Sequence, residues 1–278
     1  MKNILLPTDF SKNSINAIHY ALKFFKNQEC NFYILHVHKS SEYITDDLLA
    51  SPADTSVHDS IVQKSQKKLS NLVHKLKGVF ITDNFSFETI ADYDSFTDSV
   101  NQIVRTKNID LILMGSNGAT GAKEKIFGSN TIKVIRKVDC PVLVIPEGFK
   151  YQPVTSALLV MDHGDHFEET KITPFTEVIM KHKANVRVLK VKEDDTITIT
   201  EYNDKKNISR YFKDYEVSFH SIINIPTPIA VNSFVQIMNI DFTATFIERE
   251  TFLDRFLSGS DITKISYKTT VPLLVMHY

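Results

Sequence analysis

The chain contains no tryptophan, only two cysteines and only eight glycines among its 278 residues. Cys30 and Cys140 cannot build a disulfide framework, so we expect a reducing compartment. The sequence also lacks any run of about 18 apolar residues, which a membrane-spanning helix needs. Its first residues carry no pattern of an export signal. These absences predict a cytoplasmic protein that does not bind a membrane.

Neither sign of charge is in excess. The 32 Lys and Arg residues nearly balance 33 Asp and Glu residues, which leaves a formal net charge of −1 at pH 7. Nucleic-acid affinity depends largely on positive charge that displaces counterions from phosphates. We therefore expect no nucleic-acid partner. The hydrophobic share of 42% and charged share of 23% are typical of a globular protein with one or two cores.

Short apolar runs alternate with amphipathic stretches in the first half of the chain. The pattern predicts strands at residues 4–6, 32–37, 84–89, 110–114 and 142–145. It predicts helices at residues 11–26, 60–77, 94–105 and 129–137, with a polar loop at about 39–59. Strands that alternate with helices require crossover connections. The fold class is therefore predicted to be α/β with a parallel sheet.

The same pattern begins again after residue 153, and the two halves align. The segment VNQIVRTKNIDLILMG from Val100 matches VNSFVQIMNIDFTATF from Val231 without a gap, an offset of 131 positions. At this offset CPVLVI aligns with VPLLVM, and near the front LLPTDFS matches LLVMDHG. We predict two tandem domains, residues 1–148 and 149–278. Each would be an open five-stranded parallel sheet flanked by helices.

Four of the eight glycines fall in one segment, MGSNGATGAKEKIFGSNT, directly after the fourth predicted strand. Gly115 and Gly118 would let backbone N–H groups converge on an anion, and a helix that opens at Gly128 would favour phosphate. Ser129 and Thr131 add hydroxyl groups. Neither a Walker A loop nor the dinucleotide fingerprint after the first strand is present. The pattern predicts a polyphosphate ligand.

PTDFS at Pro7 to Ser11, LHVH at the end of the second strand and the glycine motif with its trailing Gly-Ser resemble the universal stress protein family. The resemblance covers nearly the whole chain. It implies an adenine nucleotide alpha hydrolase-like fold and binding of ATP, or of AMP or ADP, with Mg²⁺ as a companion of ATP. It implies that Asp9 and Val37 contact adenosine. The other implied binding residues are Pro7, Thr8, Met114, Gly115 and Gly118, with Gly128, Ser129, Asn130 and Thr131 at the phosphates.

The second half departs from this motif. At the same offset, larger or charged residues replace two of the glycines and the asparagine: Phe246, Arg249 and Asp261, with Glu248 and Glu250 nearby. A ring blocks the approach of the backbone to a ligand, and carboxylates repel a polyphosphate. We therefore predict one nucleotide per chain, in the N-terminal half, with a structural or regulatory C-terminal domain.

The resemblance also implies pairing through the last strand of each half. Val142–Ile145 and Leu273–Met276 are predicted to pair inside the chain and form an intramolecular pseudo-dimer, because open strand edges need cover. A homodimer of whole chains and an unidentified protein partner remain open. The predicted function is that of an adenine-nucleotide-binding protein of the stress response.

No arrangement of residues for catalysis emerges, since G-x-S-x-G and H-E-x-x-H are both absent. An enzyme is not expected. A slow ATPase and a nucleotide-free interaction scaffold remain the alternatives. Asp162, His163, Asp165 and His166 resemble a set of metal ligands, but their place in the repeat favours a strand-to-helix turn, and no metal site is predicted.

Overall fold

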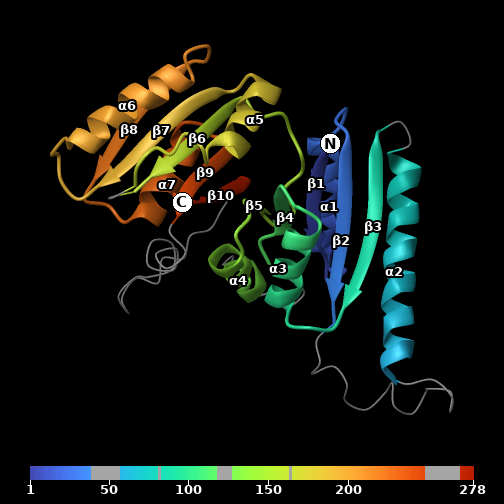
Figure 1. The fold of residues 1–278 in the computed structure, drawn as a ribbon. Helices are drawn as coiled ribbons and strands as arrows, with labels where there is room; N and C mark the ends of the chain where they lie inside the picture. The colour runs from blue at the N-terminus through green and yellow to red at the C-terminus, as the bar shows by residue number, and fades with distance from the viewer. Residues whose placement is uncertain (39–56, 81–82, 118–126, 163–164, 248–269) are drawn as a thin grey trace.

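The computed structural model describes residues 1–38, 57–80, 83–117, 127–162, 165–247 and 270–278. Strands alternate with helices within each half, and β5 is followed directly by β6 where the halves join, as Figure 1 shows. The first half comprises β1 (Lys2–Pro7), α1 (Lys12–Phe24), β2 (Cys30–Val37), α2 (Val57–Val79), β3 (Phe85–Asp92), α3 (Phe96–Thr106), β4 (Leu111–Gly115), α4 (Ser129–Lys137) and β5 (Val142–Ile145). The second half comprises β6 (Ser156–Met161), α5 (Thr173–His182), β7 (Asn185–Lys192), α6 (Ile199–Tyr211), β8 (Val217–Ile223), α7 (Thr227–Ile237), β9 (Phe242–Ile247) and β10 (Leu273–His277).

The strands form one ten-stranded sheet in the order β3-β2-β1-β4-β5-β10-β9-β6-β7-β8. All pairs within each half are parallel, and β5 pairs with β10 antiparallel. The predicted α/β class is confirmed. Each half is a five-stranded parallel sheet, as predicted, and the predicted pairing of the last strands, β5 with β10, joins the two into a single mixed sheet. That pairing covers two edges that would otherwise be open.

The two halves share strand order and register. In β4 and β5, Gly115 lies opposite Ile145, and in β9 and β10, Phe246 lies opposite Met276. Both positions differ by the offset of 131 that the sequence shows. The predicted division at residues 148 and 149 agrees with this repetition and remains a prediction.

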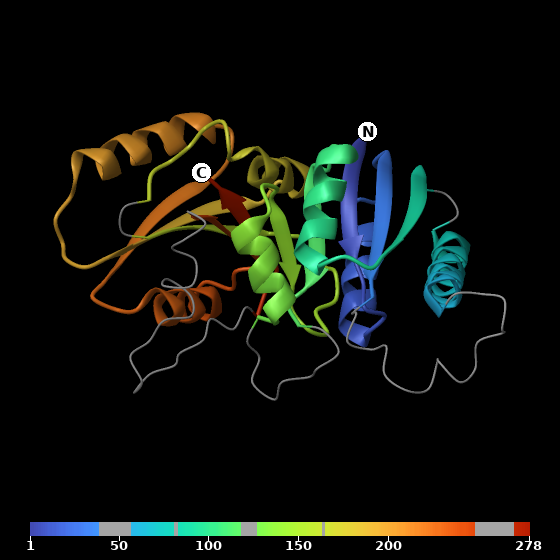
Figure 2. The ribbon, with the colours of Figure 1, turned by 60° about the horizontal axis from the view of Figure 1, so that its bottom comes forward.

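Helices cover both faces of the sheet (Figures 1 and 2). Buried residues of α1, α2, α5 and α6 pack on one face, and those of α3, α4 and α7 pack on the other. Successive strand residues alternate between the layers, so that Ile4 and Leu6 face α1 while Leu5 faces α3 and α4. Strands buried on both faces read as continuous apolar runs, which explains why LILM in β4 signalled a strand.

Local signals set the ends of the helices. Ser11 caps α1 by accepting a hydrogen bond from the backbone N–H of Ser14, and Ser95 caps α3 by accepting one from Asp98. The helix after the second strand has 23 residues in the first half and 13 in the second, which agrees with the shorter second copy. Among the described residues, no helix has the length and apolar composition to span a bilayer.

The seam between the halves is symmetric. Leu143 of β5 lies opposite Leu274 of β10, and these two residues are equivalent in the repeat. On either side, Val142 pairs with Val275 and Val144 with Leu273. Self-complementary antiparallel pairing of equivalent strands is what a twofold axis produces. The two halves are therefore related by an approximate twofold axis through the seam.

We expect loss of side-chain volume at the seam to destabilise the whole chain. Val275 is fully buried, so Val275→Ala should lower the free energy of unfolding by about 2 kcal/mol. The same change at Val79, which is 68% exposed, should cost less than about 0.5 kcal/mol. Chemical denaturation of both variants measures this difference. Equal costs would contradict the burial of the seam.

Candidate functional site

The strand order reverses beside β1, because β2 lies on one side of it and β4 on the other. Loops part at such a point, and ligands of open α/β sheets bind there, beyond the carboxyl ends of the strands. The segment after β1 and the segment after β4 border this crevice. Both contain residues that the sequence predicts for binding.

The segment after β1 is held by Thr8, which is 6% exposed. Its N–H donates to the carbonyl oxygen of Leu35 over 2.7 Å, and its hydroxyl lies 2.9 Å from that of Ser14. The same hydroxyl accepts from the N–H of Phe10, which has a φ of 61°. This tight turn holds the exposed Asp9 beyond the strand end, where its Oδ1 accepts from the N–H of Ser11 over 3.0 Å.

His36 and Val37 end the neighbouring strand β2. Nδ1 of His36 donates to the carbonyl oxygen of Thr8 over 2.8 Å, and its ring lies 4.7 Å from that of Phe10. Burial lowers the pKa of His36, although the Thr8 bond partly opposes the shift. Val37 is half-buried and packs toward α3. A neutral imidazole therefore connects the ends of β1 and β2.

At Gly115 the missing side chain makes room for Asn13 of α1. A Cβ at position 115 would lie 2.7 Å from Nδ2 of Asn13, which is closer than such contacts allow. That Nδ2 donates to the carbonyl oxygen of Asn117 over 2.6 Å and so bridges the crevice between α1 and the end of β4. Glycine was predicted here for the approach of a ligand, whereas the structure shows the approach of an amide side chain.

Two acceptors at this bridge have no hydrogen-bond partner among the described residues. They are Oδ1 of Asn13 and Oδ1 of Asn117, and both are buried. A buried polar atom without a partner costs about 1–3 kcal/mol. The end of β4 therefore offers acceptors to a ligand that brings hydroxyl or amino groups.

The start of α4 is tied to the end of β4. The N–H of Gly128 donates to the carbonyl oxygen of Ser116 over 2.7 Å. The hydroxyl of Thr131, predicted to bind phosphate, is buried and donates to the carbonyl oxygens of Gly115 and Ser116 over 3.1 and 3.2 Å. In this structure Thr131 therefore positions the helix.

Among the described residues, no side chain caps the first turn of α4. Gly128 is the N-cap residue and has no side chain to accept a hydrogen bond, and Ser129 and Asn130 are exposed. The free N–H groups of this turn and the helix dipole favour an anion. Of the other predicted residues, Pro7 and Met114 are buried in β1 and β4, and Gly118 lies outside the described residues.

Aromatic rings stack at the corresponding place in the second half. Phe246, at the position of Gly115, is fully buried and stacks on Tyr278 with ring centroids 5.4 Å apart. Tyr278 stacks in turn on His166 at 4.7 Å, and its hydroxyl donates to the backbone carbonyl of His166. Three stacked rings thus lie where the first half has Asn13 and Gly115.

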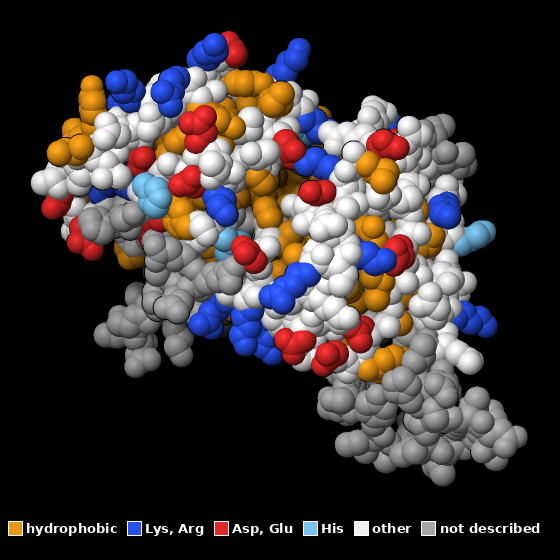
Figure 3. Space-filling model, viewed as in Figure 1, with side chains coloured by type: hydrophobic (Ala, Val, Ile, Leu, Met, Phe, Trp, Pro, Cys, Tyr) orange, Lys and Arg blue, Asp and Glu red, His pale blue; other side chains and the backbone are white. Residues whose placement is uncertain are grey.

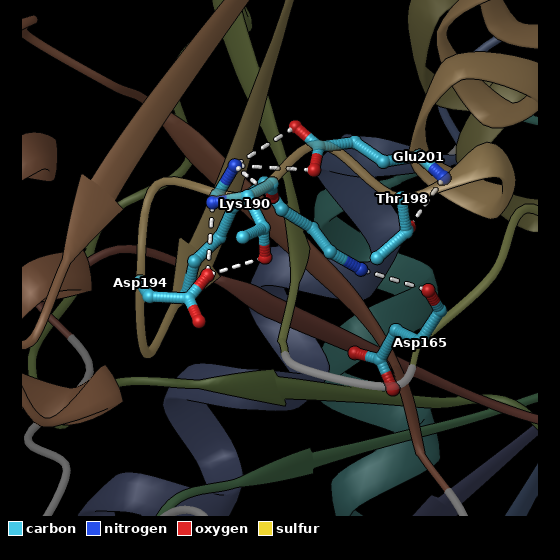
Figure 4. A network of polar contacts seen from close by, with 7 residues as sticks. Asp165, Lys190, Asp194, Thr198 and Glu201 are labelled. Atoms are coloured by element: carbon cyan, nitrogen blue, oxygen red, sulfur yellow. Dashed lines mark hydrogen bonds and ion pairs between the residues drawn. The ribbon is translucent and has the colours of Figure 1, made fainter.

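Charged side chains lie at the end of β7, where they form a network of polar contacts (Figure 4). Nζ of Lys190 donates to the carbonyl oxygen of Asp165 over 2.8 Å, and Nζ of Lys192 lies 3.2 Å from Oε2 of Glu201. Burial lowers the pKa of Lys190 and raises that of the nearby Asp204. In the register of the second half, Lys190 of β7 lies opposite Met161, the last residue of β6. The end of β7 therefore carries one ion pair, Lys192 with Glu201, and one ammonium group bonded to the backbone, Lys190.

Of the residues that resemble metal ligands, Asp162 and Asp165 hydrogen-bond to each other in the turn after β6. Oδ2 of Asp165 accepts from the N–H of Asp162 over 2.6 Å, which closes the turn after β6. His163 lies outside the described residues, and within the described part of the chain no three His, Cys, Asp or Glu side chains are grouped to hold a metal ion.

Sequence reasoning missed Asn13 and Asn117. The repeat offered a signal for the first, because Asn13 of LLPTDFSKN aligns with His166 of LLVMDHGDH, a change that accompanies Gly115 to Phe246. Nothing in the sequence singled out Asn117, whose backbone carbonyl completes the bridge.

The contact between Gly115 and Asn13 predicts a coupled pair of substitutions. Gly115→Ala should lower the free energy of unfolding by about 1–2 kcal/mol, because the new methyl group displaces the Asn13 amide. In an Asn13→Ala background the same change should cost close to nothing. Denaturation of the four proteins of this cycle measures the coupling, and additive effects would contradict the contact.

We expect the ring of His36 to titrate below its ordinary pKa of 6.5. A lowered pKa in the folded state means that the unfolded chain binds more protons, so His36 contributes less stability as pH falls below about 6.5. Following the ring resonances of His36 by NMR measures the pKa. A value above 6.5 would show that the Thr8 bond outweighs burial.

The first half of the chain matches a known protein family. The model of the universal stress protein family matches residues 1–146, which is more than half of the chain. Universal stress protein MJ0577 of Methanocaldococcus jannaschii is 26% identical over 156 residues, covering 52% of this chain and 94% of that protein. Universal stress protein YxiE of Bacillus subtilis is 27% identical over 144 residues, covering 51% and 97%.

Solved structures resemble the whole chain in fold. A universal stress protein from Archaeoglobus fulgidus superposes with a TM-score of 0.68 at 21% identity, over 98% of this chain and 95% of that one. A structure described as a functionally unknown protein, PA1789 of Pseudomonas aeruginosa, superposes with a TM-score of 0.62 at 16% identity, over 100% and 92%. The arrangement of both halves therefore has precedents.

Proposed function

The chain belongs to the universal stress protein family, and on this premise we propose that it binds one adenine nucleotide, ATP in the first instance, between β1 and β4. The observation that carries the proposal is the uncapped start of α4, which is tied beside the crevice where the strand order reverses. Binding there would make the chain a nucleotide-dependent component of the stress response. Both cysteines are free buried thiols, which agrees with a cytoplasmic location.

The phosphates would lie at the start of α4. No side chain of the described residues caps the N–H groups of its first turn, and Ser129 adds an exposed hydroxyl. Negative charge at this end of a helix is favourable by about 0.3–1 kcal/mol even at a solvated site. The bond from Gly128 to Ser116 holds this turn beside the end of β4.

The nucleoside would lie across the ends of β1 and β2. Asp9 is exposed there and accepts hydrogen bonds, and Val37 offers an apolar contact beside it. The partnerless Oδ1 of Asn117 would accept from a ribose hydroxyl, which removes the cost of burying that atom. These contacts support an adenosine that is oriented by its polar edge and its ribose.

One nucleotide per chain follows from the difference between the halves. The rings of Phe246, Tyr278 and His166 occupy the second crevice, and Lys190 and the ion pair of Lys192 with Glu201 lie at the end of β7. A nucleotide would have to displace a packed stack and separate buried charges. The second half would then serve as the structural or regulatory partner in an intramolecular pseudo-dimer, a role supported by the twofold pairing of β5 with β10.

The two alternatives make different predictions for the purified protein. Denaturing it and identifying any released small molecule separates them. Bound ATP or AMP in near-equal amount to the chain supports the proposal, and ADP that accumulates with time supports a slow ATPase. Absence of nucleotide together with no binding of added ATP would favour the scaffold that recruits a partner protein.

Asn130→Asp tests the proposed phosphate position, because it should raise the stability of the nucleotide-free protein and lower its affinity for ATP. The second residue of α4 would gain the carboxylate that Asp261 carries in the second half. This charge should stabilise the nucleotide-free protein by about 0.3–1 kcal/mol, since it lies at the positive end of the helix. It should weaken ATP binding about fivefold by repelling the phosphates. Calorimetric titration and denaturation measure the two effects.

Asn203→Asp is the matched control. Asn203 is exposed on α6 of the other half, so the same change in charge should leave the affinity for ATP unchanged. Unaltered ATP affinity in Asn130→Asp would place the phosphates elsewhere, and equal weakening in both variants would show only a dependence on net charge.

A further inference from the structure

A second cavity lies at the seam, on the face of the sheet that α1 and α5 cover. Its volume is about 610 Å³, within the range of about 300–1,000 Å³ typical of small-molecule sites. Apolar side chains from four different strands form its floor: Leu111, Leu143, Phe242 and Leu274. On the face shown in Figure 3, the surface is hollowed where the two halves meet, with hydrophobic side chains inside the hollow and charged ones around it.

The cavity follows from the twofold arrangement of the sheet. α1 packs over the strands of the first half and α5 over those of the second, and β5 and β10 lie between them. Leu143 and Leu274, which pair across the seam, both line the space between the two helices. An apolar floor therefore remains at the junction of the two helical layers.

The rim carries one ammonium group without a carboxylate partner among the described residues. Lys2 forms an ion pair with Glu177, and Asp110 accepts from the N–H of Asn3. Lys181 instead donates to the backbone carbonyl of Phe24, and its Nζ lies 5.1 Å from the centroid of that ring. The four charged side chains at this cavity balance, and Lys181 is the ammonium group among them that no described carboxylate pairs with.

We propose that this cavity binds a small amphipathic carboxylate, whose apolar chain covers the floor and whose head group pairs with Lys181. Apolar burial favours the chain at about 25 cal/mol per Å² of surface removed from water. A carboxylate supplies Lys181 with a charge-assisted hydrogen bond that a backbone carbonyl does not match. A cationic or uncharged ligand of the same length would lack this bond.

The cavity is separate from the proposed nucleotide crevice. Lys2 and Leu111, which line it, are the first residues of β1 and β4, whereas the crevice lies beyond the last residues of the same strands. The inference therefore does not depend on nucleotide binding. Saturating ATP is expected to leave the carboxylate site available.

Calorimetric titration of the full chain with decanoate tests the proposal. We expect one decanoate per chain, with affinity at least tenfold higher than for decanol and no binding of decyltrimethylammonium. Lys181→Met should weaken decanoate binding about tenfold, while Lys181→Arg, which keeps the charge, should largely preserve it. Lys213→Met is the matched control, since Lys213 is exposed and does not line the cavity.

A second variant locates the bound chain. Thr173 is exposed at the cavity rim, so Thr173→Trp can reach into the space without replacing a core residue. It should abolish decanoate binding while thermal unfolding stays unchanged. The proposal is overturned if decanoate does not bind, if decanol binds equally well, or if neither Lys181→Met nor Thr173→Trp weakens binding. A change from monomer to dimer that buries the cavity before ligand is added would also overturn it.

Discussion

The residue near the end of the fourth strand of each half decides what its crevice contains. Gly115 has no side chain, so Asn13 packs against its backbone and reaches across to Asn117. Phe246 occupies the equivalent position in the second half and builds a stack of rings. A single Cβ separates these outcomes, since it would approach the Asn13 amide to 2.7 Å. The difference between the halves at this position is thus steric before it is electrostatic.

The second constraint is the seam. Pairing of β5 with β10 removes two exposed edges and places equivalent residues opposite each other, as in a symmetric dimer. When two copies are joined in one chain, a substitution in one copy no longer appears in the other. At the position of Gly115 the second copy has Phe246 and a stack of rings, and at the end of β7 it has the ion pair of Lys192 with Glu201.

Much of the fold was predictable because its signals are local and repeated. Apolar runs such as LILM and VLVI marked strands buried on both faces, and the offset from Val100 to Val231 reappears in the strand register. Strand ends were less accurate, as in β3, which extends to Asp92 where the sequence suggested an end near Thr89. The union of the sheets was predictable only through the pairing of the last strands, because no local pattern specifies which edges meet.

The site was only partly predictable, for a physical reason. Glycine spacing and the helix start identified the end of β4, but a sequence pattern does not reveal which side chain approaches a glycine. Asn13 and the buried hydroxyl of Thr131 therefore have contacts that spacing did not suggest. Similarly, the cavity beside Lys181 depends on residues from both halves, which only the packed sheet brings together.

Counting the ATP molecules bound per chain tests the asymmetry of the two crevices most directly. Nucleotide-free protein is equilibrated by dialysis with labelled ATP up to saturation, and the bound fraction is divided by the concentration of chains. One ATP per chain is the predicted result. Two per chain would contradict a closed second crevice, and none would contradict an open first one.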